Sequence, residues 1–491
     1  MVAPFSIWTV VQLIEQLGGT PKLNPVPSRP RIGDLVALSL GGKHVTKANT
    51  NHYLPSRRAV LAGLAASPLA LAAGRAFAQP TSGTLSIGIL DWAETGIKPV
   101  FAAYEAARPG VKIDYSILPG DGPGLRQTLL SRRLANKLPD ITYLADIFAT
   151  QFANAEVTAD MRPFLTSGGP ITMTSLAKPF LDQYLVTSGP NKDGIFGLPI
   201  GADTVVLYYN KKHFDDAGIP YPNDDWTFEK QIEVATALTQ KNGTTTTRYG
   251  LAASVPWHAT YVPGIEAFGD TLLDENNMYK LQTEAAIKVF TMYWDQVKAG
   301  VIASTPQQTQ LGGGYQAFGA GTVSMIQSVR ALTPLIRSVT TDDWDVALEP
   351  KINGVRKTGM GSIAQCITPA GMANNQELAF DYLNWFYSED GGMKILAAGY
   401  GTVPPVEALY NSPIWTDLPG PPYDNRVFAE SIQYGAMNPT SIPADVQAVV
   451  DTELAKAEES VVLNNVPVAD ALKAAEAVIN EAMVRVLAAG G

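Results

Sequence analysis

Between residues 84 and 146 the apolar and polar positions follow an alternation of short strands and helices. Apolar and polar residues alternate in 84–90 (TLSIGIL), and 111–118 and 139–146 have a similar strand-like character. The two segments between them, 96–110 and 122–138, have the pattern of helices. Three strands separated by two helices at this spacing predict βαβ units and a mainly parallel sheet.

The rest of the sequence continues this mixture of strands and helices. A strand-like run, TVVLYY, begins at Thr204, and helices are predicted over 283–300, 374–392 and 467–489. The last of these is long and amphipathic. With 491 residues, the chain is long enough for about two to three domains of ordinary size. The pattern therefore predicts an α/β protein with more than one folding unit.

An uncharged run preceded by two arginines lies before this region. Arg57 and Arg58 are followed by 16 residues, Ala59 to Gly74, without a charged side chain. The run is too short for a membrane-spanning helix, which needs about 20 mostly apolar residues. It also lacks the polar stripe of a core helix. A positive start and a short apolar centre are typical of a signal peptide.

The start of this run resembles the twin-arginine export signal. The order Ser-Arg-Arg-Ala-Val-Leu begins at Ser56, and the small residues Ala76–Ala78 supply a cleavage site before Gln79. We therefore expect residues 56–78 to be removed. Because Gln79 is not a cysteine, no lipid anchor is expected, and the mature chain is predicted to be a free, soluble protein of the periplasm.

The first 55 residues have no assigned role. They contain an amphipathic helical pattern followed by Pro- and Gly-rich sequence, and no methionine occurs between Met1 and Met161. Two explanations stay open. Either the start is misassigned and translation begins at a non-methionine codon such as that of Val45, or residues 1–55 are a genuine long extension. In both cases residues 1–78 are excluded from the predicted fold.

The charge of the chain is uneven and argues against one class of partner. The net charge is −10, and residues 1–78 hold eight of the 36 basic residues but only two of the 46 acidic ones. The mature part therefore has 28 basic and 44 acidic residues, a balance of −16. Since phosphate binding needs a basic face, a nucleic-acid partner is not expected.

Few residues offer catalytic or metal-binding chemistry. The single cysteine, Cys366, excludes an intrachain disulfide, and the four histidines are too scattered along the sequence for metal-ligand spacing. The mature part contains no phosphate-binding lysine loop and no G-x-S-x-G elbow. We therefore predict no catalytic residue, no metal and no cofactor, and the chain is not expected to be an enzyme.

One segment, 197–230, resembles a segment typical of family 1 extracellular solute-binding proteins of ABC importers, which are mostly sugar binders. Its sequence, GLPIGADTVVLYYNKKHFDDAGIPYPNDDWTFEK, holds the family's Gly-x-Pro, Leu-Tyr-Tyr-Asn, Lys and Phe, Ala-Gly-aliphatic-Pro and Trp in order. Further resemblances in RPGVKIDY, LPDITYLAD, FGAGTVSMI, TGMGSIAQCI and GTVPPV extend over nearly the whole mature chain. One departure follows SMIQS, where the family often has a tryptophan that can stack on sugar and this chain has Val329 and Arg330.

The resemblance implies a type II periplasmic-binding-protein fold, in which two α/β lobes are joined by crossing strands with a ligand cleft between them. The matching segments place lobe one at 84–200 plus 356–400, and lobe two at 204–355 plus 401–491. The implied partners are a small-molecule ligand and the membrane permease of an ABC importer. We expect a monomer that needs no cofactor.

The expected ligand contacts lie after strand ends and in loops. Residues after strand ends line the cleft of an open α/β sheet, and carboxylates, indole rings and amide donors suit a sugar. The resemblance implies two of the positions: Asp203, where family members often place an acidic sugar ligand, and the loop around Trp257. The full predicted set is Asp91, Trp92, Asp146, Asp203, Trp257, His258, Tyr261, Arg330, Gly361 and Ser362.

The sequence leaves the ligand open. The same fold could bind a polyamine or an organic acid, and Arg330, if it faces the cleft, would favour an acidic or sulfated sugar. A third hypothesis is a secreted enzyme acting on saccharides, which would need two carboxylates at a fixed separation, one with a raised pKa.

Export supplies the first prediction. Replacing Arg57 and Arg58 together by lysine should block export, because the signal that they resemble depends on the arginine pair. In the wild type, N-terminal sequencing of periplasmic protein should find a start near Gln79. Normal export of the double variant, or an intact N-terminus upstream of Arg57, would contradict this prediction.

Overall fold

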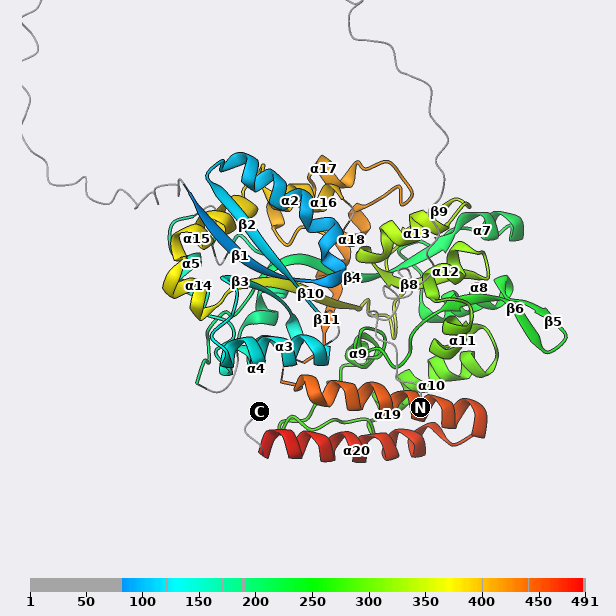
Figure 1. The fold of residues 1–491 in the computed structure, drawn as a ribbon. Helices are drawn as coiled ribbons and strands as arrows, with labels where there is room; N and C mark the ends of the chain where they lie inside the picture. The colour runs from blue at the N-terminus through cyan, green and yellow to red at the C-terminus, as the bar shows by residue number, and fades with distance from the viewer. Residues whose placement is uncertain are drawn as a thin grey trace, which may run out of the picture. The chain divides into compact units, whose positions relative to one another are not determined.

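In the computed structural model, two long antiparallel strands, β4 (Leu198–Asn210) and β10 (Thr358–Ile367), lie in the middle of the sheet (Figure 1). The structure describes residues 82–488 except 120–121, 170, 173, 187–189, 400 and 440. The predicted extension, the signal peptide and its cleavage point at Gln79 lie outside the described residues.

The described strands form an 11-stranded sheet whose main path runs in the order β2-β1-β3-β10-β4-β8-β6-β5. Three short strands lie off this path: β11 pairs with β10, β7 with β6, and β9 with β4. The strands other than β4 and β10 are β1 (Gly83–Leu90), β2 (Val111–Leu118), β3 (Ile141–Ala145), β5 (Gln240–Asn242), β6 (Thr245–Ala252), β7 (Ile302–Ala303), β8 (Val323–Val329), β9 (Trp344–Ala347) and β11 (Gly435–Met437).

The parallel pairing predicted for the first three strands is confirmed, but it does not extend through the sheet. β1 pairs in parallel with both β2 and β3. β10 instead pairs antiparallel with β3 and β4, and β4 pairs antiparallel with β8 and β9. The prediction of a mainly parallel sheet was therefore wrong at the centre, because two strands connect the halves of the sheet in opposite directions.

The first hydrophobic core lies around β1, β2 and β3. Helices α2 (Glu94–Ala107) and α15 (Gln376–Phe386) contribute Tyr104 and Tyr382, whose rings meet edge to face with centroids 5.1 Å apart. The Tyr104 hydroxyl donates a hydrogen bond to Asp381 over 2.8 Å, which ties α15 to α2. Other helices in this half are α3 (Gly122–Leu134), α4 (Ala149–Asn154), α5 (Arg162–Leu165), α6 (Lys178–Leu181) and α14 (Pro369–Asn374).

The second hydrophobic core lies among helices of the other half. α10 (Glu284–Lys298) fulfils the prediction over 283–300: the Thr283 side chain caps its start, and Gly300 with a positive φ follows its end. The predicted C-terminal helix is also confirmed as α20 (Val468–Ala488), which lies beside α19 (Ala444–Asn464) (Figure 1). The remaining helices here are α7 (Lys211–Ala217), α8 (Phe228–Leu238), α9 (His258–Ala267), α11 (Thr305–Gln310), α12 (Gly314–Gly319) and α13 (Thr333–Val339).

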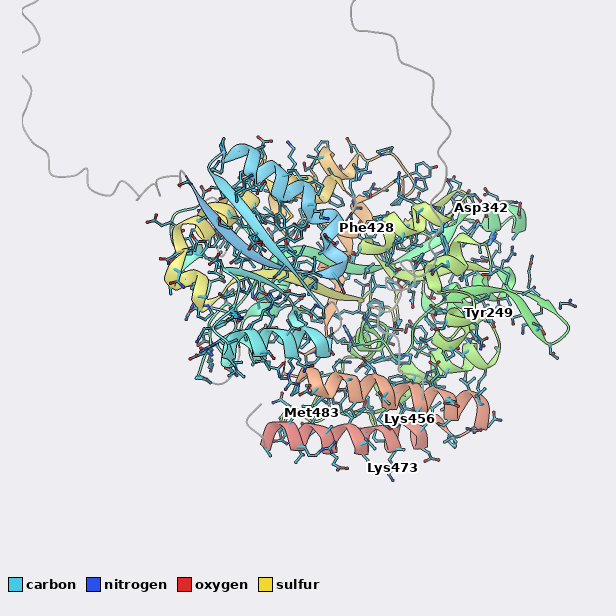
Figure 2. All side chains as sticks on the ribbon, viewed as in Figure 1. Tyr249, Asp342, Phe428, Lys456, Lys473 and Met483 are labelled. Atoms are coloured by element: carbon cyan, nitrogen blue, oxygen red, sulfur yellow. The ribbon has the colours of Figure 1, made fainter. Side chains whose placement is uncertain are left out.

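A third core joins segments from distant parts of the sequence. It contains Tyr208 of β4 and Trp344 of β9 together with Trp415 and Phe428, which belong to α17 (Pro413–Thr416) and α18 (Arg426–Ser431). Figure 2 labels Phe428 near the middle of the molecule, between the strands at the two ends of the sheet. The chain after residue 400 therefore packs at the junction before it reaches α19.

The predicted helix over 374–392 is shorter in the structure, where α15 ends at Phe386, and the next helix, α16 (Gly392–Ala398), begins only at the last predicted residue. The segment between them is close-packed, because a Cβ on Gly391 would lie 1.7 Å from the Trp385 carbonyl oxygen. Among the described residues, no helix has the length and apolar character needed to cross a membrane.

A buried carboxyl on α19 makes stability depend on pH. Glu458 is 5% exposed and accepts a hydrogen bond from Trp294 Nε1 over 3.0 Å. Burial raises the pKa of Glu458 to about 7. Because the folded protein favours the neutral acid, this contribution to stability is fully present below about pH 4.5 and is lost as the pH rises through about 7.

Glu458→Gln should therefore stabilise the protein at pH 8 by about 1–3 kcal/mol and have a much smaller effect at pH 5. The amide keeps an oxygen for Trp294 but carries no charge. Denaturant melts at the two pH values measure the difference, and Glu459→Gln on the exposed side of the same helix is the control. An equal effect of Glu458→Gln at both pH values would contradict the prediction.

Candidate functional site

Three of the predicted site residues meet around one position of β10. In the strand register Gly361 pairs with Asp203 of β4. On the other edge of β10, Ile363 pairs with Ala145, the residue before Asp146. Gly361 therefore lies between two carboxyl groups that come from different strands, and Ser362 is the next residue along β10.

Gly361 leaves an open surface between these carboxyl groups. A Cβ added to it would meet, apart from its chain neighbours, only Asp146 Oδ2 within 4 Å, at 3.4 Å. Two residues earlier on the same face, Gly359 is covered, because a Cβ there would lie 2.3 Å from the Ala259 carbonyl oxygen. The first turn of α9 therefore closes this face of β10 at Gly359 and leaves it free at Gly361.

Asp203 borders this open position, and one oxygen of its carboxyl group is buried. It is the one half-buried residue of β4, whose other twelve residues are buried. The backbone N–H of Ala331 donates to its carboxyl group, while Asp203 Oδ1 has no hydrogen-bond partner among the described residues. Burial raises the pKa of Asp203 to about 7, although the positive charge of Arg330 acts in the opposite direction. An unpartnered buried oxygen is costly unless a ligand donates to it.

Asp146 lies on the other side of Gly361 and is better satisfied. Its Oδ1 accepts a hydrogen bond from the N–H of Ile147 over 2.8 Å, and the N–H of Ser362 also donates to its carboxyl group. Burial outweighs these donors and raises the pKa of Asp146 to about 6. Both carboxyl groups are thus held in a low-dielectric environment with few positive charges nearby.

Two aromatic residues, Trp257 and His258, directly precede Ala259, which covers Gly359. Trp257 precedes α9 and His258 opens it, and both side chains are half-buried. Their ring centroids are 6.0 Å apart, with the planes at 67°. Burial lowers the pKa of His258 to about 4, so the imidazole is neutral at pH 7. It can exchange hydrogen bonds with a ligand but adds no charge.

Two predicted residues, Tyr261 and Arg330, offer no surface to a ligand in this conformation, because neither side chain is exposed. Tyr261 belongs to the second core and stacks near Phe290, with centroids 5.4 Å apart. Arg330 lies in the third core, next to the rings of Trp415 and Phe428.

The other predicted residues differ in exposure. Ser362 is buried, and its hydroxyl donates to Gln183 Oε1 over 2.8 Å and bonds with the Tyr184 hydroxyl over 2.9 Å. Asp91 is exposed in the turn after β1. The side chain of Trp92 lies outside the described residues. Gln183 and Tyr184, which hold Ser362 in place, were not predicted, because they are 178 or more residues away in the sequence.

A separate polar cavity does not coincide with this surface. It measures about 20 Å³, and its lining includes Gln231, Gln327 and Glu349 but none of the predicted site residues. That volume holds roughly one water molecule and is too small for a sugar. Among the described residues, no group of three or more His, Cys, Asp or Glu side chains is placed to hold a metal ion.

Comparisons with known proteins show the family and the fold of the chain. A sequence model of the family described as bacterial extracellular solute-binding protein matches residues 91–393. An arabinooligosaccharide-binding protein of Halalkalibacterium halodurans is 25% identical over 305 residues, which cover 59% of this chain and 63% of the relative. The match thus spans less than two thirds of that curated relative.

Two solved structures are similar over most of the described chain. One is an ABC substrate-binding protein of Listeria monocytogenes in complex with cycloalternan, with a TM-score of 0.70, 19% identity and coverage of 82% of this chain and 99% of that one. The other is a sugar-binding protein of Xanthomonas citri, with a TM-score of 0.68, 17% identity and coverage of 82% and 98%. These similarities confirm the predicted α/β fold of the type II periplasmic-binding-protein class.

Proposed function

Because the chain belongs to the bacterial extracellular solute-binding proteins, we propose that it captures a sugar or sugar derivative and delivers it to an ABC importer. The ligand would lie between lobe one, 84–200 plus 356–400, and lobe two, 204–355 plus 401–491. The observation that carries the proposal is the open position Gly361 between the carboxyl groups of Asp146 and Asp203.

The chemistry of this surface suits a neutral, hydroxyl-rich ligand. We propose that a sugar hydroxyl donates to the carboxyl group of Asp203, whose Oδ1 is buried and has no partner among the described residues in this conformation. The absence of a side chain at Gly361 lets a ring approach the strand, and the indole of Trp257 offers an apolar face for pyranose C–H groups. Asp91, Trp92, His258 and Ser362 remain further candidates at the rim, whereas the proposal does not rely on direct contact from Tyr261 or Arg330.

Two relatives bind saccharides according to their descriptions, an arabinooligosaccharide and cycloalternan. This favours a saccharide over the polyamine and organic-acid alternatives. The enclosed position of Arg330 also weakens the case for an acidic or sulfated sugar, because its guanidinium has no exposed surface with which to meet an anionic group. A hydrolase would use Asp146 and Asp203 as an acid pair, and we propose instead that the protein binds without turnover.

We propose that the protein is exported with the twin-arginine-type signal, is released near Gln79 and works in the periplasm as a monomer. Its membrane partner would be the permease of an ABC importer. The binding experiment below identifies the class of sugar.

We expect the protein to bind at least one saccharide and this binding to depend on Asp203. A thermal-shift panel of arabino-, malto- and cyclic oligosaccharides, a polyamine and organic acids should show a raised melting midpoint for at least one saccharide. For that ligand, Asp203→Asn should weaken binding by roughly 5- to 150-fold, the equivalent of about 1–3 kcal/mol. Its folding stability at pH 8 should be unchanged or higher, because a buried charge is removed.

Titration calorimetry and denaturant melts measure the two effects separately. Asp225→Asn is the control, because its side chain is 98% exposed in the same half of the chain. Trp257→Ala should weaken binding by a similar factor, and Trp257→Phe should recover part of the loss. Wild-type affinity in both Asp203→Asn and Trp257→Ala would place the ligand elsewhere, and product formation from a bound saccharide would favour the enzyme hypothesis.

Closure around the ligand is a further expectation, because β4 and β10 both cross between the two halves of the sheet. Small-angle scattering with a saturating ligand from the panel should give a smaller radius of gyration than scattering without it. Asp203→Asn at the same ligand concentration should show a smaller change. An identical profile with and without saturating ligand would indicate a rigid binding protein.

A further inference from the structure

Arg330 follows directly after β8 and has no exposed side-chain surface, an unusual position for a permanently charged residue. Its Nε–H donates to the Thr402 carbonyl oxygen over 3.1 Å, and its Nη1–H donates to Asn425 Oδ1 over 2.6 Å. The guanidinium carbon lies 4.9 Å from the Trp415 ring centroid and 5.2 Å from that of Phe428. The buried charge is therefore compensated by carbonyl and amide oxygens and two aromatic faces.

These contacts place Arg330 at a break along one edge of β4. β8 ends on this edge where Val329 pairs with Val205. At Ala202, one edge of β4 is already paired with β10. The bridge from Ala202 to Val403 therefore lies on the other edge, the one that β8 also uses. The Ala202 N–H donates to the Val403 carbonyl oxygen over 3.0 Å. Asp203 lies between these two pairings, and Arg330 spans the gap by bonding to Thr402.

The segment that Arg330 holds is also attached on its far side. The Ala177 N–H donates to the Pro405 carbonyl oxygen over 2.8 Å, and Leu176 forms a bridge with Val406. At the near side, a Cβ on Gly201 would lie 2.2 Å from Thr402 Oγ1, so β4 and this segment are in close contact. Arg330 therefore fastens the end of β8 to a segment that is joined to β4 and to residues 176–177.

The same residue bears on the charge of Asp203. Arg330 favours the ionised form of Asp203, and the next residue, Ala331, donates its N–H to the Asp203 carboxyl group. Tyr208, further along β4, also interacts electrostatically with Asp203, and Asp146 lies beyond Gly361 on the β10 side. Arg330 is the positively charged residue among them. It acts on Asp203 by electrostatic attraction, and its neighbour Ala331 acts by a backbone hydrogen bond.

We infer that Arg330 is a positioning residue for the proposed binding site. It anchors the 402–428 segment to the end of β8, and it thereby holds Asp203 in place and favours its ionised form without touching the ligand. The consequence for affinity rests on the proposed function, whereas the effect on Asp203 itself does not. Arginine suits this role better than lysine, because its planar guanidinium can stack on rings and donate in two directions at once.

The test measures the titration midpoint of the Asp203 carboxyl group in the ligand-free, full-length chain. Carboxyl carbon NMR of protein labelled at aspartate, with Asp203→Asn for assignment, gives the titration midpoint of Asp203. Arg330→Met should raise this midpoint by about one pH unit or more, because a nearby positive charge is lost. Arg426→Met is the control: this arginine is on α18 in the same segment, and its side chain is 66% exposed.

Affinity for the saccharide selected by the panel supplies the second readout. Arg330→Met should weaken binding by about tenfold at pH 7 and by less at pH 9, where Asp203 is ionised in both proteins. In an Asp203→Asn background the pH-dependent part of this loss should vanish. A purely structural role would weaken binding equally at both pH values, and that result would overturn the inference.

Arg330→Lys covers the case in which Arg330→Met does not fold. Lysine keeps the charge but not the planar fork, so we expect a smaller rise of the Asp203 midpoint and a few-fold loss of affinity that narrows at high pH. An Asp203 midpoint and affinity equal to those of the wild type would refute the inference. If no saccharide binds the wild-type protein but the midpoint shifts as expected, the proposed function fails and the link between Arg330 and Asp203 stands.

Discussion

The structure depends on one strand, β4, which must satisfy its backbone hydrogen bonds against different partners along its length. On one edge of β4, residues 198–204 pair with β10 and residues 207–210 with β9. On the other edge, Ala202 forms a bridge with Val403, and residues 205–209 pair with β8. A buried strand cannot leave these groups unpaired, so the change of partner on each edge has to occur within a few residues. Asp203 lies at the change on the β8 edge, while its other edge stays paired with Gly361 of β10. The change of pairing partner along β4 therefore accounts both for the crossing of the strand and for the position of Asp203.

The site is held at a cost to stability that the fold compensates elsewhere. Burial raises the pKa of Asp146 and of Asp203, which shows that the folded protein disfavours their charged forms. Asp203 Oδ1 has in addition no partner among the described residues. The three hydrophobic cores supply the stability that permits this arrangement. A ligand that donates to Asp203 would remove part of the cost, which couples binding to the arrangement of both halves of the sheet.

The structure shows what occupies the place after SMIQS, where the sequence departs from the family pattern. The family often has a tryptophan there that can stack on sugar, and this chain has Arg330. The tryptophan that Arg330 meets is Trp415, which stacks on the guanidinium inside the third core. An aromatic platform at this place is therefore replaced by a buried cation, and the indole of Trp257 is left as the candidate platform at the start of α9.

The sequence by itself determined the local elements whose hydrophobic period is strong. The parallel strands β1 to β3, the capped helix α10 and the amphipathic helix α20 were all predicted, because their patterns extend over whole elements. The approximate region of the site also followed from the sequence, since Asp146, Asp203 and Gly361 stand at strand ends or crossings. Only the tertiary structure decided that β10 lies between β3 and β4, that the helix predicted over 374–392 ends at Phe386, and that Tyr261 and Arg330 are buried. The physical reason is that burial of one side chain depends on its partners, and those of Arg330, at Thr402, Trp415 and Asn425, are 72 to 95 residues away along the chain.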